Sequence, residues 1–347
     1  MTPALRVLSP GLLTTVQDLG RLGLQHVGIP TSGALDPVGL RAANALVGNP
    51  PNAAALEVAY LGPALAVEAE DVRLSVAGAD ADIVIVSDAA ASSGERIKGN
   101  RSIRLHQGNV IRIGSLIGGA LVYIAVEGGF DIAPVLGSAS TYIRGGFGGW
   151  QGRALAAGDR LPLRRAKASE QAEFQLDGLD LLPPKKIRAV PGPQADYFSE
   201  TEVAAFFGSE YTVSQGSDRM GMRLSGRQIR HARGFDIISD AIPPGAIQIP
   251  GNGQPIVLLA DRQTTGGYPK IATVISADLP ALGRLAIGAR IAFAAVSIEE
   301  AVAARRAHLA TIEQIAHMIK PLKYTAEEMT QRLSDNNLID GVVEAVA

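Results

Sequence analysis

Residues 72–76 read Val-Arg-Leu-Ser-Val, so apolar and polar side chains alternate at every position. A period of two is typical of a β-strand that buries one face. Many short strands separated by frequent turns indicate a β-barrel or sandwich rather than a parallel sheet. The other apolar runs that suit strands, separated by turns rich in Gly and Pro, are residues 83–86, 110–113, 121–126, 187–190, 211–213, 246–249, 256–259, 272–275 and 290–293.

Few stretches suit helices. Asp36 can cap a helix that has Pro37 in its first turn and ends at Gly48. A second helix should begin near Ser297, with two glutamates in its first turn, and run to about Lys320. A third helical stretch covers 325–333. The sequence therefore predicts a mainly β protein with a few short helices and a helical C-terminal tail.

The chain has 347 residues, which suggests about two domains. A faint repeat supports this number, because an apolar strand followed by an acid and Gly-Gly occurs at 121–129 and again at 256–267. The charged, Pro-containing stretch 164–186 is the best candidate boundary. The expected division is two β-domains followed by the tail, at 1–184, 185–296 and 297–347.

Composition excludes several classes of function. Lys and Arg total 32 against 34 Asp and Glu, so the net charge is −2 and nothing favours a nucleic acid or an anionic membrane. The absence of Cys excludes disulfides and thiolate metal sites, and no metal site is expected. No apolar run approaches the roughly 18 residues that span a bilayer. We expect a soluble, cytoplasmic protein.

One group of candidate catalytic residues lies in a glycine-rich loop. The loop at 18–26 contains three such residues, Asp18, Arg21 and His26. An arginine beside a carboxylate and glycine amides can hold a carboxylate or amide substrate, and His26 can transfer protons near neutral pH. The alternative is that Asp18 and Arg21 only hold the loop in shape.

A second candidate site follows the strand expected at 256–259. An acid, a guanidinium, two hydroxyls and glycine amides in one loop suit a phosphate, a carboxylate or a developing oxyanion. The alternative is a plain hairpin with surface charges. The catalytic candidates are Asp261 and Arg262, and the substrate-binding candidates are Arg219, Gln248, Thr264, Thr265, Gly266, Gly267 and Lys270. For Asp36 we expect a capping role and for Glu57 a structural hydrogen bond.

The same stretches carry a resemblance to a known family, from about Val7 to Phe293. The sequence is similar to the allophanate hydrolase subunit 2 family, also called the biotin-dependent carboxyltransferase or urea amidolyase-related family. That family includes KipA-like proteins and the C subunits of bacterial 5-oxoprolinases. The motifs are residues 15–21, 28–37, 52–57, 191–196, 217–221, 245–250 and 261–269.

The resemblance implies two tandem cyclophilin-like β-barrel domains and a KipI-like sister protein, the B subunit, often with a catalytic third protein, the A subunit. It implies a part in the ATP-dependent opening of 5-oxoproline to glutamate. In that reaction the loop from Asp261 would bind a phosphorylated or carboxylated intermediate. No nucleotide-binding motif is present, so ATP is expected in the complex rather than at a located site in this chain. We expect the chain to be inactive alone.

Two alternatives stay open. The first is a biotin-dependent carboxyltransferase acting on a urea-like amide, with biotin carried by a partner because this chain has no Ala-Met-Lys-Met-like sequence. The second is a non-catalytic, KipA-like protein that binds a KipI-like regulator. The sequence departs from the family pattern at Arg284 and at 287–289, which puts a turn and one ligand contact in question.

Overall fold

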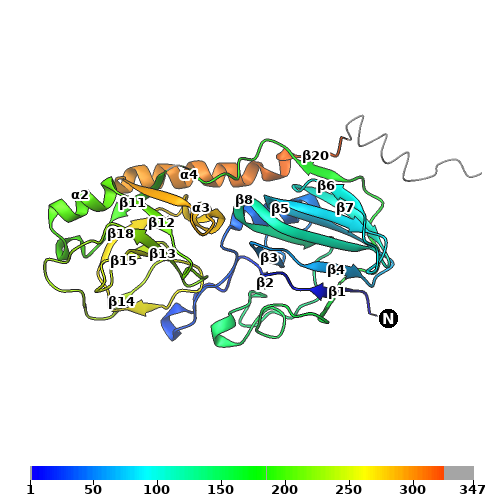
Figure 1. Cartoon of the computed structure of the whole chain (residues 1–347), viewed down its shortest axis with the longest axis horizontal. Helices are drawn as coiled ribbons and strands as arrows, with labels where there is room; N and C mark the ends of the chain where they lie inside the picture. The colour runs from blue at the N-terminus through cyan, green and yellow to red at the C-terminus, as the bar shows by residue number, and fades with distance from the viewer. Residues whose placement is uncertain (1, 185, 324–347) are drawn as a thin grey trace, which may run out of the picture.

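The computed structural model describes residues 2–184 and 186–323. Two β units lie side by side, and one long helix, α4 (Ile298–Gln314), runs along both of them (Figure 1). The predicted mainly β fold with few helices is confirmed. Within the described part of the chain, no helix is long and apolar enough to cross a membrane.

The first unit is an eleven-stranded sheet with the order β20-β10-β7-β5-β8-β4-β1-β9. Two further pairings extend it, because β3 joins β2 to β8 and β6 pairs with β5. The strands are β1 (Ala4–Ser9), β2 (Leu13–Gln17), β3 (Ala55–Ala59), β4 (Ala64–Val67), β5 (Asp71–Val86), β6 (Glu95–Ile97), β7 (Arg101–His106), β8 (Val110–Val126), β9 (Arg160–Pro162), β10 (Phe174–Leu176) and β20 (Ile319–Pro321).

The long antiparallel pair β5 and β8 forms the spine of this unit. Its register runs from Leu74 opposite Val126 to Val86 opposite Val110, with irregularities between Gly78 and Asp80 and between Ala81 and Ile83. Irregularities of this kind bend a strand locally. Each long strand can therefore pair with different neighbours at its two ends, and the apolar residues of both enclose one core.

The second unit is a closed barrel with the strand order β11-β18-β15-β16-β13-β12-β19. The parallel pair β11 and β19 closes it, and the other pairs are antiparallel. The barrel strands are β11 (Lys186–Pro191), β12 (Glu210–Val213), β13 (Gly221–Gly226), β15 (Ala246–Gln248), β16 (Ile256–Leu258), β18 (Lys270–Val274) and β19 (Arg290–Ala295); a small pair, β14 (Asp240–Ala241) and β17 (Thr265–Gly266), lies beside them.

The helices begin where capping residues predict. Asp36 accepts a hydrogen bond from the Val38 amide at 3.0 Å and caps α1 (Pro37–Leu46). In α4, the Ser297 hydroxyl and the Glu300 carboxylate form a reciprocal capping box. The remaining helices are α2 (Glu200–Gly208), α3 (Leu279–Arg284) and the 3-10 turns at Gln25–Val27, Ile143–Gly145, Ala195–Tyr197 and Ile315–Met318.

The tail is not only helical, which corrects the prediction. The α-helix ends at Gln314 rather than near Lys320, and β20 then pairs with β10 of the first sheet. The helix stops early because Ile315 and its neighbours turn onto the core beside α1. The expected helix at 325–333 lies outside the described residues. Since β10 belongs to the sheet and β11 to the barrel, we propose a domain division at 184/185.

Candidate functional site

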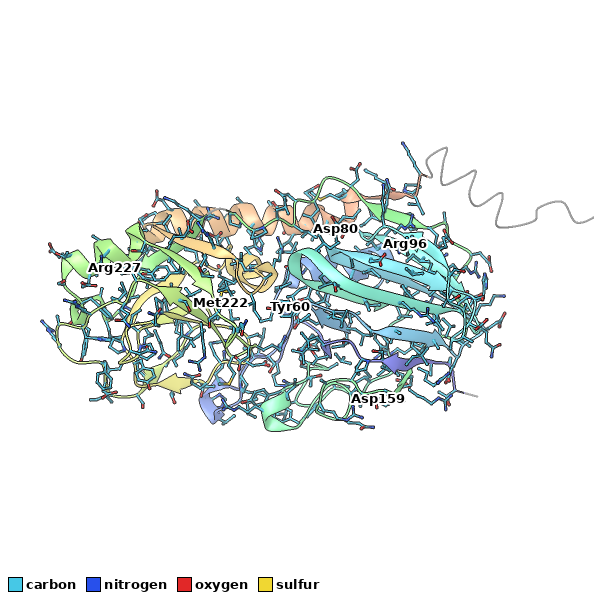
Figure 2. All side chains as sticks on the ribbon, viewed as in Figure 1. Tyr60, Asp80, Arg96, Asp159, Met222 and Arg227 are labelled. Atoms are coloured by element: carbon cyan, nitrogen blue, oxygen red, sulfur yellow. The ribbon has the colours of Figure 1, made fainter. Side chains whose placement is uncertain are left out.

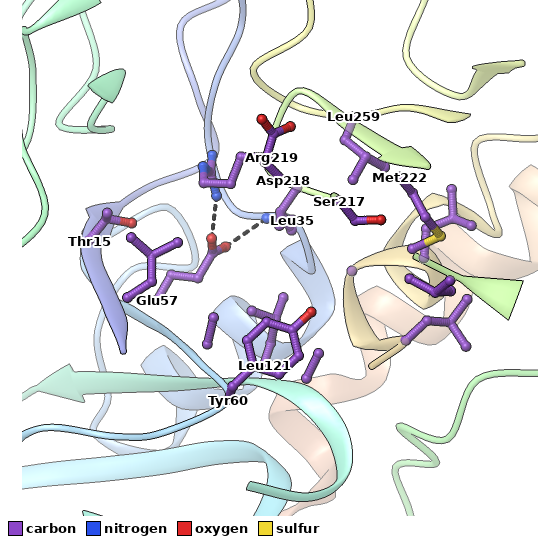
Figure 3. A pocket seen from close by; sticks show the side chains of 17 residues that line it. Thr15, Leu35, Glu57, Tyr60, Leu121, Ser217, Asp218, Arg219, Met222 and Leu259 are labelled. Carbon is purple, nitrogen blue, oxygen red and sulfur yellow. Dashed lines mark hydrogen bonds and ion pairs between the residues drawn. The ribbon is translucent and has the colours of Figure 1, made fainter. Parts of the chain in front are cut away.

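A cavity of about 150 Å³ lies between the two β units (Figure 3). Tyr60 from the first unit and Met222 from the second both lie near the middle of the molecule in Figure 2. Ten of the lining residues are Leu, Ala, Val or Met, and six are polar or charged. The walls are Leu13, Thr15, Leu35, Glu57, Ala59, Tyr60, Ala120, Leu121, Val213, Ser217, Asp218, Arg219, Met222, Leu259, Leu282, Gly283 and Leu285. A mainly apolar cavity with a few polar groups is typical of small-molecule sites.

Arg219 is the polar centre of this cavity and connects the two units. Its Nη1 pairs with Glu57 of the first unit, and its Nε donates to Asp261 Oδ2 at 2.9 Å. Its Nη2 donates to the Gly33 carbonyl at 2.6 Å. Burial alone would lower the pKa of Arg219, but the charges of Glu57 and Asp261 outweigh burial and raise it above its ordinary value. Arg219 therefore stays charged inside the protein.

Glu57 is held from both sides of its carboxylate. Besides Arg219, it accepts hydrogen bonds from the Tyr123 hydroxyl at 2.6 Å and the Leu35 amide at 2.8 Å. The Tyr123 oxygen in turn accepts from the Asp36 amide at 2.9 Å. Burial, together with the negative charges of Glu57 and Asp36, raises the pKa of Tyr123 well above its ordinary value. Tyr123 is therefore a permanent donor to Glu57.

Arg284, one of the departures from the family pattern, makes a second ion pair between the units. Its Nε and Nη2 contact the two carboxylate oxygens of Asp36 at 2.6 and 3.0 Å. The turn at 287–289 is intact, since Gly288 has φ +83° and its amide donates to the Val213 carbonyl. The departure therefore adds a contact between the units without disturbing the strand turn.

This arrangement suits a small, mainly apolar molecule with one oxygen that accepts a hydrogen bond. Arginine has five N–H donors, and the four contacts of Arg219 leave one Nη1 hydrogen unassigned. Both carboxylate oxygens of Glu57 are already engaged, one by Arg219 and the other by the Tyr123 hydroxyl and the Leu35 amide. Burial raises the pKa of Tyr60, whose backbone is in the left-handed region at φ +64°. The cavity can bind and orient a substrate, and no complete catalytic set lines it.

Asp261 and Arg262 were predicted to act together, but their side chains have different environments. Asp261 faces the junction and pairs with Arg219. Arg262 is buried inside the second unit, where its Nε and Nη1 donate to the carbonyls of Ile242 and Leu259 at 3.0 and 3.2 Å. Burial lowers the pKa of Arg262 to about 10.

The other candidates from the second loop do not line the cavity. Thr265 and Gly266 were expected to offer free amides, but they form strand β17 and pair with Asp240–Ala241. Lys270 is buried and contacts Asp240 at 2.8 Å, and Gln248 reaches the Tyr268 carbonyl at 3.4 Å. Thr264 and Gly267 accept backbone hydrogen bonds from Ile242 and Ile237. These residues therefore do not join Arg219 at the cavity, and a phosphate cradle along this stretch stays a prediction.

The first candidate group is also divided. Asp18 accepts from the hydroxyls of Ser138 and Ser140 and from the Ala139 amide, which holds two loops together. Arg21 is buried, donates to the Ser140 carbonyl, and its Nη1 is enclosed without a partner among the described residues. Burial lowers the pKa of Arg21, although Asp18 and Asp261 oppose this. His26 is exposed in the 3-10 turn Gln25–Val27.

Two residues at the junction were missed as functional candidates. Glu57 was expected to be structural, yet it lines the cavity and pairs with Arg219. Tyr123 was read only as part of a strand. One signal was visible, because Glu57 is the single charged residue in the apolar run 53–59. Within the described chain, no three His, Asp or Glu side chains gather closely enough to hold a metal ion.

Comparison with known proteins gives the family. Residues 27–295 match the family model described as carboxyltransferase domain, subdomain A and B. The chain belongs to this carboxyltransferase family. The C subunit of the Escherichia coli 5-oxoprolinase is 40% identical over 314 residues, which cover 90% of this chain and 97% of that protein. The C subunit of the Haemophilus influenzae 5-oxoprolinase is 36% identical, and the match covers 88% of this chain and 95% of that protein.

Solved structures agree with this membership. The K. lactis urea amidolyase superposes with a TM-score of 0.80 at 28% identity, covering 94% of this chain. The matched region is 21% of that enzyme, so the chain corresponds to about a fifth of a much longer protein. The two β units of the carboxyltransferase family are thus found both as a separate chain and as part of a large enzyme.

Proposed function

We propose that this chain is the C subunit of a 5-oxoprolinase, which opens 5-oxoproline to glutamate in an ATP-dependent reaction. The observation that carries the proposal is the match to the C subunits of two 5-oxoprolinases along nearly their full length. The apolar walls of the cavity between the units would contact the lactam ring of 5-oxoproline, and Arg219 is the cation there for one of its oxygens.

In this proposal the junction binds the substrate and the partner proteins complete the reaction. The free N–H of Arg219 would donate to an oxygen of 5-oxoproline, while Glu57 and Asp261 hold the guanidinium in place. Donors fixed before the substrate arrives stabilise developing negative charge at low reorganisation cost. The apolar walls would exclude water from the ring.

ATP and the other subunits belong to the proposal as well. The stretch from Asp261 to Gly267 lies outside the cavity walls, and the side chains of Asp261 and Arg262 are engaged within the protein. We therefore assign ATP to a partner and derive no step through it in this chain. The partners in this assignment are a KipI-like protein as the B subunit, together with a catalytic A subunit, and the chain alone should be inactive.

A second candidate function is a biotin-dependent carboxyltransferase acting on a urea-like amide. The observation that favours it is the similarity to K. lactis urea amidolyase. Biotin would arrive on a partner. The near-complete coverage of the 5-oxoprolinase subunits makes the first proposal the better supported one.

The test is phosphate release from ATP, with and without 5-oxoproline, by the chain alone and after co-expression with the subunits encoded beside it. We expect release that depends on 5-oxoproline and requires this chain in the complex. If the complete complex releases no more phosphate with 5-oxoproline than without it, the first proposal fails. Carboxybiotin-dependent turnover of urea would then support the second.

A further inference from the structure

A buried lysine in the second barrel takes no part in the junction cavity. Lys270 begins strand β18 and is 1% exposed, and its ammonium contacts the carboxylate of Asp240 at 2.8 Å. Neither residue lines the cavity between the units. Asp240 belongs to the short strand β14, which lies on the side of the barrel away from α4 (Figure 1). A lysine buried to this degree needs a partner for its charge, and this partner is half exposed.

A glutamine from the neighbouring strand lies beside this lysine. Gln248 is directly opposite Lys270 in the pairing of β15 with β18, just past an irregularity between Ile247 and Gln248. Side chains in such a position lie on one face of the sheet, about 5 Å apart at Cβ. Irregularities in strand pairing often redirect a side chain next to a binding site. Gln248 is itself buried and makes one long hydrogen bond, from Nε2 to the Tyr268 carbonyl at 3.4 Å.

A second glutamine approaches Lys270 from the loop after β11. The side-chain oxygen of Gln194 accepts a hydrogen bond from the Lys270 amide at 3.3 Å. The loop is held tightly against β18, because the Gly192 amide donates to the Ile271 carbonyl at 2.8 Å. A Cβ at Gly192 would lie 2.1 Å from the Lys270 carbonyl oxygen, so only glycine allows this approach. Since β11, β18 and β15 are neighbours in the barrel, three adjacent strands bring one ammonium and two amides together.

Asp240 already places a carboxylate at this point. The hydrogen bonds from Lys270 and the Ala241 amide lower the pKa of Asp240, so it is ionised. Its Oδ2 contacts the ammonium and also lies 3.5 Å from Gln194 Nε2. Because half of its side chain faces solvent, Asp240 can turn away from Lys270 while the barrel stays folded. An external carboxylate can therefore compete with Asp240 for Lys270.

We propose that Lys270, Gln194 and Gln248 form a binding site for a small carboxylate, which takes the place of the Asp240 side chain. The ammonium supplies the charge, and the glutamine amides supply neutral N–H donors for the carboxylate oxygens. Asp240 is then a placeholder that keeps the buried lysine paired when no ligand is bound. This site goes beyond the proposed function and does not rest on it.

The test is an NMR titration of the full chain with acetate, followed on the acetate methyl line at constant ionic strength in chloride. Asp240→Ala removes the competing carboxylate, so this variant should bind acetate about tenfold or more tightly than the wild type. Lys270→Met in the Asp240→Ala chain should abolish that binding. If this double variant does not fold, Gln194→Ala in the same background should weaken the binding about threefold or more.

Two controls make the result specific. Asp196→Ala is the matched variant, because Asp196 is a similarly exposed carboxylate of the second unit and pairs with Arg233; it should change acetate binding less than about twofold. Acetamide has the shape of acetate without its charge, so it should bind to Asp240→Ala at least about tenfold more weakly. The proposal is wrong if Asp240→Ala binds acetate no more tightly than the wild type, if Asp196→Ala gains as much, or if acetamide binds as well as acetate.

Discussion

Arg219 and Arg262 are both buried, but their surroundings differ. Arg219 lies at the junction of the two units between Glu57 and Asp261. Arg262 lies inside the second unit, where backbone carbonyls accept its hydrogen bonds and burial lowers its pKa. The difference teaches that a guanidinium flanked by carboxylates from both units marks the place where they meet and where a ligand cavity opens.

The largest effect is expected at the junction. Replacing Arg219 with Leu leaves two buried carboxylates without their cation, so we expect a loss of about 3–5 kcal/mol in the free energy of unfolding. Urea denaturation measures it. Arg227→Leu is the control, since Arg227 pairs with Glu202 at 3.5 Å and is half exposed; its loss should stay below about 1 kcal/mol. Equal losses of stability in Arg219→Leu and Arg227→Leu would contradict the special role of the buried ion pairs at the junction.

A second prediction at the junction concerns Tyr123, which contacts Glu57, the partner of Arg219. Tyr123→Phe removes the hydroxyl that donates to Glu57 and accepts from the Asp36 amide. A buried amide without an acceptor should lower the free energy of unfolding by about 2 kcal/mol. The same denaturation measurement applies. A neutral result would mean that Glu57 does not depend on Tyr123.

A smaller loss of stability is expected for Arg262, the buried arginine inside the second unit. Arg262→Met removes two hydrogen bonds to carbonyls, but it also removes a buried charge that no carboxylate balances. These effects oppose each other, so the expected loss is about 1 kcal/mol. Thermal unfolding of Arg262→Met beside Arg219→Leu checks it. The comparison breaks if the Arg262 variant is the less stable of the two.

The smallest effect concerns His308, whose neighbours are mostly cations. Its pKa in the folded protein is lowered, so the folded state resists protonation more than the unfolded chain does. Stability should therefore fall as the pH drops below about 6.5, by less than about 1 kcal/mol because the side chain is partly exposed. His308→Gln should flatten the profile between pH 7 and pH 5. If the stability of His308→Gln falls with pH as steeply as that of the wild type, protonation of His308 is not the cause.

The strands and the first helix could be predicted from local patterns. A strand at 72–76 and the cap at Asp36 follow from neighbouring residues, and both are present in the structure. The expected exposed face of that strand is wrong, because Arg73 and Ser75 are as buried as the apolar residues between them. The tail was harder, because its helix ends where Ile315 meets a core built by residues far away in the sequence. Strand β20 could not be foreseen from three residues whose partner is β10.

The site was predictable only in part for the same reason. Arg219 and Asp261 stand in motifs that the sequence displays, and the structure pairs them. Glu57 reaches them only through the contact between the units, which no local pattern encodes. Thr265 and Gly266 were read as part of a loop, but they form the short strand β17, whose partner β14 no local pattern indicates.

The most direct test of the central claim is 5-oxoproline-dependent phosphate release by the co-expressed complex that carries Glu57→Gln. This change keeps the shape of the side chain but removes the charge that pairs with Arg219. Arg96→Gln is the control, because Arg96 is exposed on the first unit and lies away from Tyr60 and Met222 at the cavity (Figure 2). The account predicts an assembled complex whose release falls about tenfold or more with Glu57→Gln and is unchanged with Arg96→Gln. Equal release by the wild-type and Glu57→Gln complexes would contradict it.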